Sequence, residues 1–325
     1  MYNNLNNYLG VIFATIFLLF SWYPLLVDSQ IYPTTPVGCS KVSYSAEKLA
    51  TIPASFDARD KWGDCISPVR TQKGCGSCWA QVTSGLLADR TCIATNGLVK
   101  TLLSPQYILG CSNNCKEGGQ CNIGCRGGYI DVTLAFLESN GVVSDVCLPY
   151  QANDGSCPST CSNGESISNA TKVKAGKCYT YASLQDVQYE IMTKGPVIAT
   201  FALYPEFSDY SGGVFVRTSN NIKEGHAARV YGWGNENGVD YWLAANSWGT
   251  SWGINGHFKI RRGTDEVGFE DNFISADANT DDLSETLYGS TWSNPSSGSA
   301  LKPSFYLILT IIAYLILVPL FQSFA

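Results

Sequence analysis

Thirteen cysteines in a chain of 325 residues are the feature that most restricts what this sequence can fold into. An apolar run over residues 9–20 indicates a secretory signal peptide, residues 1–29, cut near Ser29. Cysteines pair in the oxidising compartments that such a peptide leads to. We therefore expect a disulfide-bonded domain. Because no positive charge precedes the apolar run, a retained anchor is the alternative interpretation of residues 1–29.

Composition and charge exclude other classes of protein. Hydrophobic residues make up 45% of the chain and charged residues 15%, which predicts a sizeable core rather than disorder. The net charge is −6, and no basic patch interleaved with aromatic residues is present. These properties argue against nucleic acid as a partner. The acidity is interpreted as a solvated surface, and a monomer is expected.

Residues 75–79, Cys-Gly-Ser-Cys-Trp, stand at the start of a helix predicted from Cys78 to about Ile93. The dipole of a helix favours a thiolate at its N-terminus. Glycines just before the helix allow the backbone to approach a substrate closely. These are properties of a nucleophile. By itself, however, the Cys-x-x-Cys spacing fits equally well a Cys75–Cys78 disulfide or half of a metal site.

Three further motifs accompany this stretch. Gln72 lies six positions before Cys78, His226 lies in a Gly-His-Ala string, and Asn246 lies in an Asn-Ser-Trp-Gly string. The histidine follows the cysteine by about 150 residues. Together the motifs resemble those of papain-like cysteine proteases, in particular a cathepsin B-like subgroup, over residues 52–277.

The resemblance implies an α+β, papain-like fold of two lobes with the active-site cleft between them. A helical lobe is expected over residues 52 to about 170 and a β-barrel-like lobe over about 178–275. Ser104 and Pro105 predict the cap and first turn of a second helix, and residues 129–139 predict a third. Strands are predicted at residues 197–203, 226–233, 241–246 and 257–261.

The same resemblance implies catalytic roles for four side chains. Cys78 would be the nucleophile, and His226 would take and return its proton. Asn246 would orient the imidazole, while the Gln72 amide and the Cys78 backbone N–H would hold the oxyanion. A buried core histidine is the alternative for His226, and a turn residue is the alternative for Asn246. His257 is interpreted as structural.

The resemblance also implies a set of substrate-contacting residues. These are Gly76, Gly127, Gly128, Ala227, Trp248 and Glu270. The glycines would offer bare backbone to an extended peptide, and Trp248 would shield the His226–Asn246 contact. Glu270 would lie at the floor of the S2 pocket and accept an arginine side chain. A solvated surface acid is the alternative for Glu270.

Disulfide pairing is implied by the cathepsin B pattern rather than by spacing. The implied pairs are Cys65–Cys92, Cys75–Cys125, Cys111–Cys157 and Cys147–Cys161, with Cys115–Cys121 following from them. Cys39 and Cys178 are then left over, either free or bonded to each other. A zinc site built from Cys111, Cys115, Cys121 and Cys125 is the alternative. We expect no metal and no cofactor.

The implied activity is endopeptidase cleavage of proteins or peptides through an acyl-enzyme. Cathepsin B removes C-terminal dipeptides with a loop that carries two histidines. The region between Cys147 and Cys178 has no histidine, so we expect no dipeptidyl carboxypeptidase activity. The alternatives are a catalytically silent adhesion module on the same scaffold and an acyl-transferring peptide ligase.

The two ends of the chain depart from a simple secreted enzyme. Residues 30–51 are interpreted as a short propeptide-like segment before the peptidase domain, residues 52–277. A Ser/Asp-rich stalk, residues 278–304, is followed by an apolar tail, residues 305–325. The tail predicts a GPI-attachment signal or a transmembrane anchor. The expected location is the secretory pathway, leading to a lysosome or vacuole, the exterior or the cell surface.

Overall fold

The computed structural model describes residues 38–116, 118–281 and 283. The predictions for residues 1–29 and 305–325, and those for most of the stalk, lie outside the described residues. Within the described ranges, no helix combines the length and the apolar character needed to cross a membrane.

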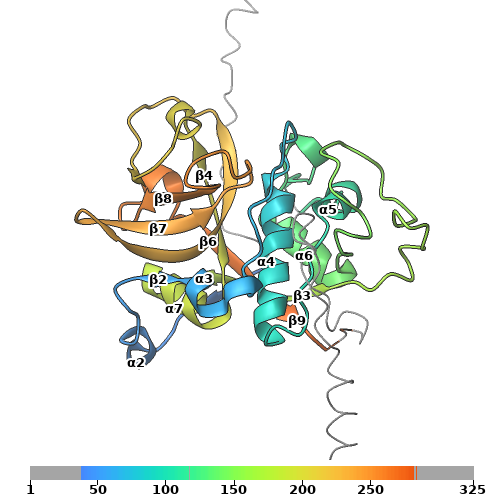
Figure 1. Cartoon of the computed structure of the whole chain (residues 1–325), viewed down its shortest axis with the longest axis horizontal. Coiled ribbons are helices and arrows are strands. Elements are labelled where there is room, and N and C mark those ends of the chain that lie inside the picture. The colour runs from blue at the N-terminus through green and yellow to red at the C-terminus, as the bar shows by residue number, and fades with distance from the viewer. Residues whose placement is uncertain (1–37, 117, 282, 284–325) are drawn as a thin grey trace, which may run out of the picture. The chain divides into compact units, whose positions relative to one another are not determined.

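Helices and strands alternate along the described chain (Figure 1). The α-helices are α2 (Ala46–Leu49), α3 (Ala58–Trp62), α4 (Cys78–Ala94), α5 (Pro105–Cys111), α6 (Ile130–Asn140) and α7 (Leu184–Lys194). The strands are β1 (Ser40–Val42), β2 (Phe56–Asp57), β3 (Lys174–Tyr181), β4 (Val197–Leu203), β5 (Val214–Phe215), β6 (Glu224–Glu236), β7 (Val239–Ala245), β8 (His257–Arg261) and β9 (Phe273–Asn279). Four 3₁₀ turns are η1 (Gly63–Cys65), η2 (Gly124–Arg126), η3 (Pro205–Phe207) and η4 (Glu266–Gly268).

Helix α4 begins at Cys78, as predicted, and is buried from Trp79 to Cys92. Figure 1 shows it between strands β4, β6, β7 and β8 on one side and helices α5 and α6 on the other. Gly85 permits close packing against β6, because a Cβ there would lie 2.7 Å from the Arg229 guanidinium. Arg229 in turn forms an ion pair with Asp89 of α4 at 3.0 Å. These contacts fix the helix against β6.

The strands form a nine-stranded mixed sheet in the order β1-β3-β9-β4-β6-β7-β8-β5, with β2 paired to β6 off this path. The pairs β1–β3 and β5–β8 are parallel, and the remaining pairs are antiparallel. The path ends at β1 and β5, so the sheet is not closed into a barrel. The predicted α+β class is confirmed, but the β-rich half is an open, curved sheet rather than a barrel.

Aromatic side chains fill the core of the β-rich half. Phe207 packs edge-on against Phe258 with ring centroids 5.0 Å apart, and Phe201 packs against Phe269 at 5.2 Å. Such pairs add roughly 0.5–1.5 kcal/mol each beyond the burial of their area. Phe201 lies in β4, which pairs with β6, and Phe258 lies in β8, which pairs with β7. The aromatic core therefore supports the two strands that position His226 and Asn246.

Local sequence signals located seven of the helices and strands, namely α4, α5, α6, β4, β6, β7 and β8. Ser104 caps α5 by accepting a hydrogen bond from the Tyr107 N–H at 2.9 Å, and β4 and β8 have the predicted bounds. Eight helices and strands were missed, namely β1, α2, β2, α3, β3, α7, β5 and β9. Strand β3, for example, is mostly half-buried and polar, so it lacks the apolar run from which strands were predicted.

Six disulfides account for all cysteines except Cys78. Five of them are the pairs that the family resemblance implied, and the sixth joins Cys39 to Cys178. The alternative Cys75–Cys78 disulfide is wrong because Cys75 is bonded to Cys125. The alternative zinc site is likewise wrong because all four of its cysteines are in disulfides. Cys78 is the one free thiol.

Candidate active site

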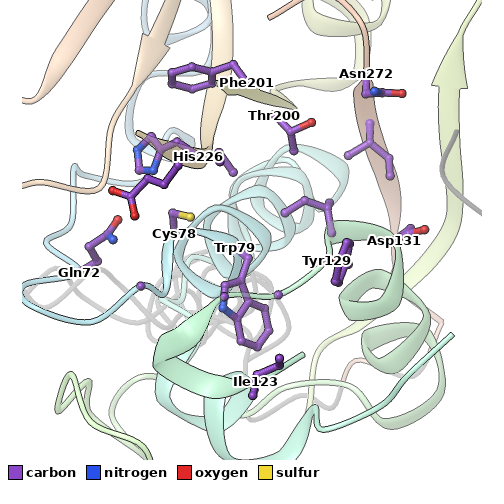
Figure 2. A pocket seen from close by; sticks show the side chains of 18 of the residues that line it. Gln72, Cys78, Trp79, Ile123, Tyr129, Asp131, Thr200, Phe201, His226 and Asn272 are labelled. Carbon is purple, nitrogen blue, oxygen red and sulfur yellow. The ribbon is translucent and has the colours of Figure 1, made fainter. Parts of the chain in front are cut away.

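A cavity of about 370 Å³ lies where the start of α4 meets β6. Figure 2 shows Gln72, Cys78 and His226 toward one end of it, with Tyr129, Asp131 and Asn272 toward the other. Eight residues predicted from sequence line the cavity. They are Gln72, Gly76, Cys78, Gly127, Gly128, His226, Ala227 and Trp248.

Cys78 and His226 come from two different elements. Cys78 is the first residue of α4 and is half-buried, whereas His226 is the third residue of β6 and is buried. Asn246, which directly follows β7, lies behind the imidazole, with its Oδ1 2.8 Å from His226 Nε2. The pairing of β6 with β7 brings the two together.

The Asn246 contact sets the tautomer of His226. The Ser247 N–H donates to the same Oδ1 at 2.7 Å, which identifies this atom as an acceptor. His226 Nε2 must therefore carry the hydrogen of the shared bond, and Nδ1 is left as the basic nitrogen. An imidazole in this state can accept a proton from a thiol in the cavity.

Burial opposes an isolated charge on either partner. It raises the pKa of the Cys78 thiol to about 11 and lowers the pKa of His226 to about 4, although the Asn246 contact acts to raise the latter. Proton transfer from sulfur to imidazole creates two opposite charges together, and each offsets the desolvation of the other. The geometry therefore favours charging as a thiolate–imidazolium pair.

Gln72 is held at both ends of its side chain. Its Oε1 accepts from the Ser247 hydroxyl at 2.6 Å, and its Nε2 donates to the Cys75 carbonyl at 3.0 Å. The backbone N–H of Gln72 also donates to the Ser247 carbonyl at 2.7 Å. An amide nitrogen has two hydrogens, so Nε2 retains a second donor.

Two of the predicted glycines are required by close packing. A Cβ on Gly76 would lie 2.5 Å from the Cys125 carbonyl oxygen, and one on Gly128 would lie 2.5 Å from the Trp79 ring. No side chain fits at either position without displacing backbone or indole. The cavity wall therefore has bare backbone there, which an extended peptide can approach.

Two aromatic rings enclose the imidazole. Trp248 lies with its ring centroid 5.0 Å from that of His226, and Phe201 packs edge-on at 5.4 Å. They cover the face of the ring and limit water near the Asn246 contact, which keeps that hydrogen bond in a low-dielectric setting. Phe201 was not singled out from sequence.

Glu270 is not part of the cavity, contrary to our expectation. Its Oε1 accepts from the Trp242 indole N–H at 2.8 Å and from the Gly263 N–H at 2.7 Å, while its Oε2 accepts from the Asp265 N–H at 2.8 Å. The carboxylate thus closes a turn. The same segment instead contributes Asn272 and Ile274 to the cavity.

Sequence reasoning missed an acidic residue that does line the cavity. Glu224 lies two positions before His226 in β6, and alternate residues of a strand point to the same face. The Glu224 side chain is exposed. Burial of Cys78 is the main reason that the pKa of its thiol is raised, and the negative charge of Glu224 raises that pKa further. The spacing of two residues between Glu224 and His226 was the available signal, but the predicted strand, residues 226–233, began after it.

Comparisons with known proteins agree on one class. The family described as "Papain family cysteine protease" matches residues 52–276. A "Cathepsin B-like cysteine proteinase 3" of Caenorhabditis elegans is 40% identical over 258 residues, covering 72% of this chain and 68% of the relative. A "Cathepsin B-like CP3" of Giardia intestinalis is 35% identical over 228 residues, covering 68% and 73%.

Solved structures give the same result. The structure of procathepsin B S9 from Trypanosoma congolense superposes with a TM-score of 0.68 at 30% identity, covering 77% of this chain and 86% of that one. A digestive procathepsin L2 from Tenebrio molitor superposes with a TM-score of 0.63 at 29% identity, covering 76% of each chain.

Proposed function

This chain belongs to the papain family of cysteine proteases, among its cathepsin B-like members, and from that premise we propose that it is an endopeptidase using Cys78, His226 and Asn246. One observation carries the proposal. Cys78, the single free thiol of the chain, lies at the N-terminus of α4 and lines the same cavity as His226. The Nε2 atom of His226 is hydrogen-bonded to Asn246, which leaves Nδ1 as the basic nitrogen.

Acylation would proceed through the paired charges. His226 takes the thiol proton, and the Cys78 sulfur attacks the carbonyl carbon of the scissile peptide bond. The oxyanion accepts hydrogen bonds from the second Gln72 Nε2–H and from the Cys78 backbone N–H. His226 then returns the proton to the leaving nitrogen, the C–N bond breaks, and a thioester remains on Cys78.

Deacylation reverses the proton movements. A water molecule gives a proton to His226 and attacks the thioester carbonyl. The C–S bond breaks, and the sulfur recovers the proton as the carboxylic acid product leaves. The same two oxyanion donors serve both steps, because the same carbonyl oxygen carries the negative charge each time.

We expect internal cleavage rather than removal of C-terminal dipeptides. The chain has two histidines, and each already has a hydrogen-bond partner. His226 is bonded to Asn246, and His257 Nδ1 lies 2.7 Å from the Tyr231 hydroxyl. Among the residues that line the cavity, none comes from the Cys147-to-Cys178 region.

The test uses peptides of matched sequence with a blocked or a free C-terminus. The full-length chain should cleave the blocked peptides internally at mildly acidic pH, with no preference for the free carboxylate. Stepwise loss of dipeptides from free C-termini would contradict endopeptidase action. Products joined to an added amine, in preference to hydrolysis, would favour the ligase alternative.

The charges that line the cavity favour a basic substrate side chain. The cavity is lined by two carboxylates and by no lysine or arginine. One of them, Asp131, is paired with Lys116 Nζ at 2.5 Å. Glu224 is exposed, which leaves its carboxylate open to a substrate cation. We assign to Glu224 the role that was expected of Glu270.

Replacing Glu224 by glutamine should therefore change selectivity. The kcat/KM for a peptide with arginine two residues before the scissile bond should fall roughly fivefold relative to a phenylalanine peptide, which corresponds to about 1 kcal/mol for an exposed ion pair. Glu165→Gln, an exposed acid outside the cavity, is the matched control. A larger loss in Glu270→Gln than in Glu224→Gln would restore the original assignment.

We propose that the enzyme enters the secretory pathway, and its cysteine chemistry supports this. Six disulfides support a compartment that is oxidising during folding, as in the secretory pathway. Its substrates are proteins or peptides, as membership of the family implies. Attachment to a membrane through residues 305–325 stays a prediction, because that segment lies outside the described residues.

A further inference from the structure

The short turn of residues 72–77 separates the two groups that would hold the oxyanion. Gln72 opens it, and the Cys78 backbone N–H follows its last residue. The middle of the turn is attached to Cys125. Cys75 forms a disulfide with Cys125, and the Gly76 N–H donates a hydrogen bond to the Cys125 carbonyl at 2.9 Å. The Cys75 carbonyl also accepts from Gln72 Nε2 at 3.0 Å and from the Ser77 N–H at 2.7 Å, but no hydrogen bond joins Gln72 directly to Ser77.

The Tyr150 hydroxyl joins the two ends. It donates to the Gln72 carbonyl at 2.8 Å and lies 2.6 Å from the Ser77 hydroxyl. A tyrosine hydroxyl has one hydrogen, so Ser77 must be the donor of the second bond. The Tyr150 oxygen thus contacts Gln72, which bears the first oxyanion donor, and Ser77, which directly precedes the second donor, the Cys78 N–H.

The position of Tyr150 is itself fixed by α5. The Leu148 carbonyl accepts from the Ser104 hydroxyl at 2.6 Å, and the Gln151 N–H donates to Gln106 Oε1 at 2.9 Å. Bonds on both sides of Tyr150 therefore tie its backbone to the first turn of α5. Tyr150 is not among the residues that line the cavity, so it does not meet the substrate there.

The other hydrogen bonds of Gln72 run to Ser247 and to Cys75, and none of them reaches Ser77. Ser77 is fully buried and its side chain does not cap α4, so without Tyr150 its hydroxyl would lose a buried partner. An unsatisfied buried group of this kind costs about 1–3 kcal/mol. The Gln72 carbonyl would keep only the Cys75 N–H, at 3.4 Å. Gln72 would stay bonded to Ser247, but the link between the two ends of the turn would be lost.

We propose that Tyr150 is a positioning residue, whose hydroxyl sets the spacing of the Gln72 amide and the Cys78 N–H around the oxyanion. This inference rests on the proposed thiol-protease function. It separates two properties of the site. The reactivity of the thiol depends on His226, whereas stabilisation of the oxyanion depends on the turn, so a loss of the Tyr150 hydroxyl acts on the second property alone.

The experiment compares Tyr150→Phe with wild type in three assays. Peptide hydrolysis should lose roughly tenfold in kcat with KM unchanged, less than the 10²–10³ expected for removal of a donor itself. Affinity for a peptide aldehyde, which adds the thiol and forms an oxyanion-like hemithioacetal, should fall to the same extent. Alkylation of Cys78 by iodoacetamide, which forms no oxyanion, should keep its rate.

Two further variants make the result decisive. Ser77→Ala should reproduce the pattern from the other end of the turn, and in a Gln72→Ala background Tyr150→Phe should have a smaller effect. Tyr179→Phe is the matched control, because that hydroxyl donates to Asp277 at 2.7 Å outside the cavity. It should leave all three assays unchanged.

Specific results would overturn the inference. An unchanged kcat and aldehyde affinity in Tyr150→Phe would remove the positioning role. An equal loss in all three assays would show a general structural effect instead. A wild-type chain that is alkylated at Cys78 yet hydrolyses no peptide would contradict the proposed function itself, which is a distinguishable outcome.

Discussion

Replacing Cys78 by alanine should abolish peptide hydrolysis, with kcat falling by roughly 10⁶-fold, as when a triad nucleophile is removed. The reason is chemical, because the remaining twelve cysteines are all in disulfides and cannot take over. The assay is hydrolysis of a blocked peptide by full-length wild type and variant, with thermal unfolding measured on both.

The presence of one free thiol also predicts how many alkyl groups the native chain takes up. Without reductant, iodoacetamide should add once to the native wild type and not at all to Cys78→Ala, as read by intact mass. Cys78→Ser is the conservative comparison, since a serine hydroxyl keeps the shape of the site but ionises far less readily than a thiol. Hydrolysis by the folded alanine variant at the wild-type rate would refute the assignment of the nucleophile.

Residues from separate sequence motifs come together in the structure. Cys78, His226 and Gln72 each stand in a short string of residues, and the structure brings all three to one cavity with Asn246 behind the histidine. Such strings are informative because the backbone geometry they need is local: a helix start, a strand and a tight turn. Contacts between distant segments then follow from the fold.

The outer wall of the cavity was predicted less well. Glu270 was assigned to it, but Asp265 and Val267 have left-handed backbones, with φ of 50° and 55°, next to Gly268 at 73°. Valine rarely adopts this conformation, so nothing in the sequence indicated that the chain folds back there. The fold-back turns the Glu270 carboxylate toward Trp242 and away from the cavity.

The same limit explains why the two open ends of the expected barrel-like sheet were not predicted. A barrel needs pairing between the two end strands, and this depends on partners far apart in the sequence. Here one end of the sheet is β1, which pairs only with β3, and the other is β5, which pairs with β8. Strand β1 belongs to the segment that was interpreted as propeptide-like.

That segment is built into the fold, at least from residue 38 onward. Strand β1 pairs in parallel with β3, and Cys39 is bonded to Cys178 of β3. The Tyr44 N–H donates to Asp186 at 2.7 Å, and the Tyr44 hydroxyl bonds to Glu190. Among the described residues, none before Gln72 lines the cavity. Residues 38–51 therefore do not block the cleft.

The Glu190 contact connects the segment to α4, the helix that begins at Cys78. Glu190 forms a buried ion pair with Arg90 of α4 at 2.8 Å, and Tyr44 contacts the same carboxylate. Removing one partner of such a buried cluster is costly, because the others keep their desolvated charge. The segment thus contributes to the stability of α4 instead of inhibiting the site that α4 carries.

Cutting the chain at a protease site inserted between Thr51 and Ile52 should therefore leave residues 38–51 attached. We expect both pieces in one species under non-reducing conditions, two pieces after reduction, and kcat/KM within about twofold of the uncut chain.

Replacing both Cys39 and Cys178 by serine should lower the free energy of unfolding by about 2–4 kcal/mol. After cutting, this variant should lose the segment on gel filtration. Release of the segment from the disulfide-intact chain, or a large rise in activity on cutting, would instead show a removable inhibitory propeptide.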